Sequence, residues 1–163
     1  MVWSMEILWS EFSGGIPDGR QLVVIIIRLA ASALLGAAIG FERQSAGKAA
    51  GLRTHILVTT GSTLFMLSCL GARMDSDALS RVIQGIATGI GFVGAGTILK
   101  RKSEHNIEGI TTAAGIWMAA AIGVTIGLGS LGLALMATGL TLVVLRAVFL
   151  WESRNAMRNK SQD

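Results

Sequence analysis

The sequence predicts an all-α integral membrane protein, a bundle of five transmembrane helices. Of its 163 residues, 52% are hydrophobic and only 15% are charged, against about a quarter charged in an average soluble domain. The apolar residues form runs that suit membrane helices, which need about 20 residues at 1.5 Å each. Lysine and arginine gather beside these runs, a pattern that membrane topology explains. We therefore expect membrane lipids to surround most of the chain. We expect no nucleic-acid partner.

The first 20 residues are expected to form a periplasmic or interfacial segment. Trp3, Ile7 and Leu8 fall on one helical face, which suits either a short helix lying in the interface or a frayed terminus. The segment has acidic residues and no basic start, so it does not resemble a signal peptide.

Five apolar runs are predicted to cross the bilayer within a membrane domain at residues 21–151. The predicted spans are residues 22–41, 55–70, 82–99, 110–126 and 129–150. The last two come from one run of about 40 residues, which is too long for a single span. The basic tail, residues 152–163, is expected to be cytoplasmic and disordered.

The third run is rich in glycine and is predicted to be the central helix. Glycine weakens a helix in water by about 1 kcal/mol relative to alanine, whereas in lipid small residues let helices approach closely. The first span carries a similar small-residue pair, Gly36 and Gly40. The packing glycines expected in the third run are Gly85, Gly89, Gly91, Gly94 and Gly96.

Two glycine motifs suggest nucleotide binding, but neither has the required context. Residues 89–94 match the G-x-G-x-x-G string, yet a membrane helix and not a strand precedes them. Gly47 and Lys48 resemble part of a P-loop, but Ala49 stands where a magnesium-binding hydroxyl is needed. We expect no cofactor.

The distribution of basic residues predicts the orientation. Most lysines and arginines lie in the 42–55 loop, the 100–109 loop and the tail, and cytoplasmic loops retain such residues. The N-terminus is therefore predicted outside and the C-terminus inside.

Near the outer face, Arg28 lies inside the first predicted span, where a charge is costly unless it snorkels or is paired. Snorkelling is one interpretation, and an ion pair with Asp77 is the other. Asp75 and Asp77 are also weak candidate ligands for hydrated Mg²⁺.

Polar residues also gather at the inner ends of the spans. One interpretation is helix capping and anchoring, with Glu42 paired to a neighbouring arginine and a threonine capping the fourth span. The other is a cytoplasmic docking or ligand pocket, whose arginines favour phosphate or acidic partners. The residues of this group are Glu42, Arg43, Arg53, Lys100, Thr111 and Thr112.

Four motifs between residues 28 and 129 resemble the MgtC/SapB family of bacterial inner-membrane proteins. They are GAAIGFERQ at 36–44, GLRTHILV at 51–58, GIGFVGAG at 89–96 and GITTAA at 109–114. The resemblance implies that Asp77, Arg81, Gln84 and Asn106 match polar family positions. It also implies a link to growth under magnesium limitation. Longer members add a cytosolic C-terminal domain resembling an ACT fold, which this chain is expected to lack.

The favoured function is a non-enzymatic regulator or interaction protein in adaptation to low magnesium. The alternative is a small channel or transporter for Mg²⁺ or another cation, formed by an oligomer. No nucleophile–base pair or metal cluster indicates an enzyme. Small-residue faces favour a homodimer or higher oligomer, and the resemblance suggests ATP synthase as a membrane partner.

Overall fold

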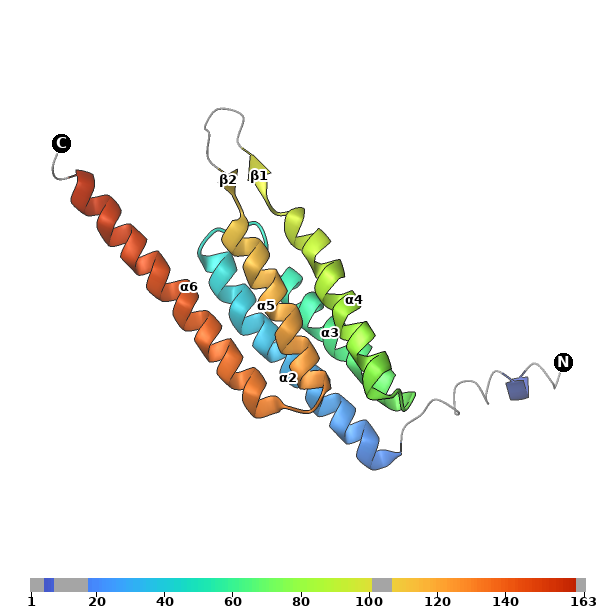
Figure 1. Ribbon diagram of the computed structural model, residues 1–163. Helices are drawn as coiled ribbons and strands as arrows, with labels where there is room; N and C mark the ends of the chain where they lie inside the picture. Colours follow the sequence, from blue (N-terminus) through green and yellow to red (C-terminus); the bar gives the residue numbers. More distant parts are fainter. Residues whose placement is uncertain (1–4, 8–17, 101–106, 161–163) are drawn as a thin grey trace.

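The computed structural model describes residues 5–7, 18–100 and 107–160, and for residues 99, 100, 107 and 148–160 it describes only the backbone. This part of the chain is helical apart from one antiparallel pair of two-residue strands (Figure 1). In chain order the elements are α2 (Gly19–Ser45), α3 (Leu52–Gly71), α4 (Ser76–Ala95), β1 (Leu99–Lys100), β2 (Ile107–Glu108), α5 (Ile110–Gly127) and α6 (Leu131–Lys160).

The prediction of a helical membrane protein is confirmed. Helices α2, α3, α4 and α5 are long and apolar enough to cross a bilayer, which makes four candidate spans. Helix α6 occupies the fifth predicted run, and its described apolar part, Leu131–Ala147, is shorter than these four. Successive helices alternate in direction (Figure 1). Most of the predicted interfacial segment lies outside the described residues, which include a helical stretch at 5–7 and, at 19–20, the start of α2.

Several helices extend beyond the predicted membrane spans, because polar residues continue them past their apolar runs. Helix α2 continues to Ser45, so Glu42 and Arg43 form its last turn and do not belong to a loop. Helix α4 begins at Ser76, so Asp77 and Arg81 are helical. Helix α6 continues to Lys160, so the predicted disordered tail is helical to that residue.

Helices α2, α3 and α5 end in the same Schellman turn. In α3, for example, the Met74 amide donates to Cys69 O at 3.1 Å and the Arg73 amide donates to Leu70 O at 3.0 Å. This turn needs one left-handed residue, usually glycine. Helices α2 and α5 use Gly47 and Gly129, whereas α3 uses Arg73, with φ 53°. A non-glycine residue there costs about 1 kcal/mol or more.

Helix α3 packs mainly against α2 and α5, and α5 is the most buried of the four candidate spans. Gly36 and Gly40 of α2 lie against α3, where added Cβ atoms would come within 2.6 Å of Thr59 Oγ1 and 2.7 Å of Leu52 Cα. From the other side, Gly123 of α5 lies directly against Thr59 O of α3. Small residues let these backbones approach closely.

Helix α4, predicted to be central, is instead the least buried of the candidate spans. Added Cβ atoms at Gly85, Gly89 and Gly91 would meet nothing within 4 Å. Gly94 is buried and lies 3.4 Å, measured from an added Cβ, from Ala113 Cβ of α5. Gly96, after the helix, is close only to carbonyls of its own turn. The central-helix prediction was therefore wrong, and most of the α4 glycines face open space within this chain.

Candidate functional site

A buried ion pair stands where α2 ends. Arg43 Nη2 donates to Glu42 Oε1 at 2.7 Å, and Arg43 Nε donates to Glu42 Oε2. Their side chains are 3% and 10% exposed, respectively. Two parallel bonds between guanidinium and carboxylate are the strong form of such a pair. Of the two partners considered for Glu42, the structure selects Arg43 and leaves Arg53 exposed at the start of α3.

His55 lies deep in the same end of the bundle and is fully buried. Its Nδ1 is 2.9 Å from Gly51 O. Because a carbonyl oxygen only accepts, Nδ1 donates, and Nε2 of the neutral ring is left as an acceptor. Nε2 has no hydrogen-bond partner among the described residues. It faces Gly115 of α5, where an added Cβ would lie 3.6 Å away.

A line of hydroxyl groups continues from His55 along the buried side of α3. Thr59 donates to His55 O at 2.6 Å, and Thr63 is within 3.0 Å of Thr59 O. Thr63 Oγ1 also donates to Gly123 O of α5 at 2.9 Å, which ties the two helices together. These hydroxyls are therefore satisfied by backbone carbonyls inside the bundle.

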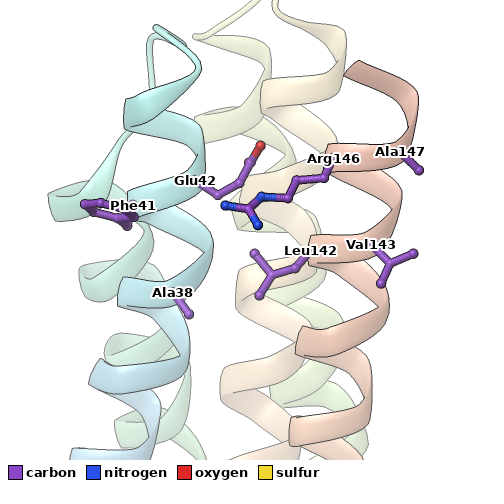
Figure 2. Close-up of a pocket in the computed structure, with 7 residues that line it drawn as sticks. All are labelled: Ala38, Phe41, Glu42, Leu142, Val143, Arg146 and Ala147. Carbon is purple, nitrogen blue, oxygen red and sulfur yellow. The ribbon is translucent and has the colours of Figure 1, made fainter. Parts of the chain in front are cut away.

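The α2–α6 pocket opens beside the ion pair and has a volume of about 480 Å³. Its lining residues are Ala38, Phe41, Glu42, Leu142, Val143, Arg146 and Ala147. Figure 2 shows the Arg146 guanidinium extending from α6 toward α2 and Glu42. Glu42 therefore belongs both to the buried pair and to the pocket wall. The pocket combines an apolar surface with one carboxylate and one guanidinium, so it suits a partner that is mainly apolar and carries a few polar groups.

Sequence analysis missed two members of this region. Neither Arg146 nor His55 is among the site residues predicted from the sequence. The available signal for His55 was a histidine followed at helical spacing by Thr59 and Thr63. That spacing places all three on one helix face.

The predicted ion pair between Arg28 and Asp77 is not formed. Arg28 Nη1 instead donates to Gly127 O at 2.7 Å, at the C-terminal end of α5. The last carbonyls of a helix lack partners in their own helix and carry partial negative charge. They therefore satisfy the partly buried guanidinium without a carboxylate. Asp77 and Arg81 are exposed on α4.

The weak metal candidates have other surroundings. Asp75 is the N-cap of α4, and its Oδ1 accepts from the Ala78 amide at 2.7 Å. The described residues contain no group of three or more His, Cys, Asp or Glu side chains able to hold a metal ion. Gln84 is exposed on α4, outside the α2–α6 pocket.

The structure separates the remaining inner residues from the pocket. Thr112 is buried and Thr111 is exposed. Neither is the N-cap of α5, because that position is Gly109 with φ 100° and no capping side chain. The predicted threonine cap was therefore wrong. Lys100 lies in β1, and Asn106 lies outside the described residues.

Comparison with known proteins gives one family. The sequence model described as the MgtC family matches residues 29–153. SrpB of Synechococcus elongatus is 46% identical over 141 residues, which cover 80% of this chain and 77% of SrpB. YhiD of Escherichia coli K12, which is named as a candidate magnesium transporter, is 47% identical over 127 residues, covering 74% of this chain and 58% of YhiD.

MgtC of Salmonella typhimurium LT2 is 47% identical over 113 residues. The match covers 69% of this chain and 47% of MgtC, so this chain spans about half the length of that relative. No solved structure matches the chain.

Proposed function

This chain belongs to the MgtC family, and on that premise we propose that it is a non-enzymatic regulator of the bacterial inner membrane. It serves adaptation to magnesium limitation by contact with another membrane protein, for which family resemblance suggests ATP synthase. It crosses the membrane five times, with its N-terminus outside and its C-terminus inside, and works as a homo-oligomer, with a dimer favoured. The observation that carries this proposal is the α2–α6 pocket, which opens beside the buried Glu42–Arg43 pair.

The shape and chemistry of the pocket support a protein partner. Apolar side chains such as Phe41 and Val143 are well exposed on its walls. A partner helix would cover them and meet Glu42 as an acceptor and Arg146 as a donor. Transmembrane helices associate through packing with a few polar contacts, which is the combination that this pocket offers.

The interior of the bundle supports a regulator better than a cation carrier. Thr59 and Thr63 of α3 are bonded to backbone carbonyls, and Glu42 is paired with Arg43. A cation pathway needs oxygen ligands or carboxylates that are free to receive the ion. The buried polar groups described here are already engaged, apart from His55 Nε2.

A transporter of Mg²⁺ or another cation is the second candidate, favoured by the name of the relative YhiD. In that case the pathway would lie between subunits of an oligomer, and purified protein in liposomes would carry a saturable cation flux.

One pair of variants tests the regulator proposal. A photo-crosslinking amino acid at Val143, in the pocket, is compared with the same group at Leu135, which is exposed on α6 outside it. In magnesium-starved cells we expect a discrete adduct with one membrane protein from position 143 and none from position 135. Equal adducts from both positions would contradict the regulator proposal. Saturable Mg²⁺ flux by the purified chain would favour the transporter instead.

A further inference from the structure

A second pocket, of about 440 Å³, lies at the opposite end of α2 from the α2–α6 pocket. It lies between the start of α2 and the end of α3, and we name it the arginine pocket. Its lining residues are Arg20, Gln21, Val24, Ile25, Arg28, Leu67, Leu70, Gly71 and Arg73. Three of these are arginines and none is a carboxylate. Its role is separate from that of the proposed partner site.

We propose that the arginine pocket binds the phosphate headgroup of an anionic phospholipid. Guanidinium groups match phosphate oxygens in charge and in hydrogen-bond geometry. Arg20 and Arg73 are exposed at the mouth of the pocket. The side chains that would contact the glycerol and the first acyl carbons are Val24, Ile25, Leu67 and Leu70.

The depth of the pocket favours a lipid over a small soluble anion. Arg20 and Arg28 lie on the same helix, separated along its axis by about 12 Å at 1.5 Å per residue. The pocket therefore extends from the end of the helix into the apolar part of the bundle. Arg28 is held by its bond to Gly127 O, and a guanidinium has further N–H groups available for a ligand.

The backbone at Arg73 gives an independent reason to assign it a binding role. Helices α2, α3 and α5 end in Schellman turns, and two of them place glycine at the left-handed position. At the same position α3 carries Arg73, with φ 53°, although glycine adopts this conformation without strain. Strain of this kind is often found at functional sites. Here it places a third cation at the pocket.

The test measures lipid binding by the purified full-length chain in detergent. Native mass spectrometry follows binding of short-chain phosphatidylglycerol, short-chain phosphatidylcholine and inorganic phosphate. For the unmodified chain we expect phosphatidylglycerol to bind about tenfold more tightly than phosphatidylcholine. R20Q and R73G each remove one exposed charged contact, so each should weaken phosphatidylglycerol binding about threefold to fivefold.

Two controls separate binding from folding. R73G places glycine in a left-handed turn, so its melting temperature without lipid should equal or exceed that of the unmodified chain. R81Q removes an exposed arginine of α4 that does not line the pocket, and it should bind phosphatidylglycerol normally. R28Q is avoided because it would also remove the bond to α5.

Three results would overturn the proposal. One is equal binding of phosphatidylglycerol and phosphatidylcholine by the unmodified chain. Another is a loss of binding in R20Q and R73G no larger than that in R81Q. The third is displacement of phosphatidylglycerol by an equal concentration of inorganic phosphate, which would assign the pocket to a free anion.

Discussion

Arg43 has one of the partners expected from the sequence, whereas Arg28 has a different one. Arg43 is paired with the residue that precedes it, and Arg28 with a helix terminus. In lipid an unpaired charge is expensive, whereas a carboxylate or a free carbonyl removes much of that cost. His55 differs from both, since one ring nitrogen is bonded and the other faces a glycine surface.

We expect the Glu42→Ala variant to be clearly destabilised, because it leaves Arg43 buried without its partner. Breaking a buried pair from one side costs about 3 kcal/mol or more. Denaturant unfolding in detergent micelles measures this cost. In a double-mutant cycle with Arg43→Ala, the double variant should lose less stability than the sum of the two single variants. Additive losses of unfolding free energy would show that Glu42 and Arg43 do not stabilise each other.

At the scale of elements, α3 packs closely against α2 and α5 because both neighbours present glycines to its buried, polar side. Thr59 and Thr63 bond to carbonyls, and glycines of α2 and α5 leave room for close backbone contact. Helix α4 has a comparable glycine content but contacts the bundle mainly through α5. A glycine therefore acts as a packing residue only where another helix occupies the adjacent space.

Alanine at Gly36 should destabilise the bundle, whereas alanine at Gly85 should not. An added Cβ at Gly36 would lie 2.6 Å from Thr59 Oγ1 and 2.8 Å from His55 O. Overpacking of this kind costs about 1–3 kcal/mol. At Gly85 an added Cβ meets nothing within 4 Å, so helix propensity alone would favour alanine. Thermal unfolding of G36A and G85A in the same detergent decides this, and equal melting temperatures would contradict the close α2–α3 contact.

The bond from Thr63 to Gly123 O should contribute measurably to the α3–α5 contact. Valine has a similar shape without the hydroxyl, so T63V is expected to lose about 0.6 kcal/mol, a typical value for a hydrogen bond between membrane helices. Thr138 is a matched control because it donates to Ala134 O, within its own helix. A loss in T138V as large as in T63V would argue against a specific interhelical contribution, with both measured by denaturant unfolding in micelles.

The described helices form a bundle in which successive helices alternate in direction (Figure 1). Many large apolar side chains of this part of the chain are exposed on its outer surface. The α2–α3 loop and the β1–β2 pair lie at one end, and the α3–α4 and α5–α6 connections lie at the other (Figure 1). The two pockets also lie at opposite ends of α2. In the proposed orientation, the α2–α6 pocket lies toward the cytoplasm and the arginine pocket toward the outer leaflet.

Cysteine labelling in intact cells tests this orientation. Met74 lies in the exposed α3–α4 connection and Lys48 in the exposed α2–α3 loop. In a Cys69→Ala background, M74C should react with a membrane-impermeant maleimide from outside. K48C should react only after the inner membrane is permeabilised. The reverse pattern would invert the proposed topology.

The sequence by itself indicated that lipid surrounds the helices, that the fold is all-helical, and approximately where each helix lies in the chain. Hydropathy and run length depend on neighbouring residues in the chain, so local reasoning was sufficient for α2 to α5 and for the place of α6. The helices continue past the predicted spans at Glu42 and Asp77, because polar residues pair or cap at their ends.

Only the tertiary structure decided which residues meet. Lipid and protein interior are both apolar, so hydropathy does not separate the buried face of a membrane helix from its lipid-facing one. For that reason the sequence could not show that Gly36 packs while Gly85 does not, or that Arg28 binds the end of α5. Nor could it show that His55 is fully buried, because these contacts depend on how helices far apart in the chain pack together.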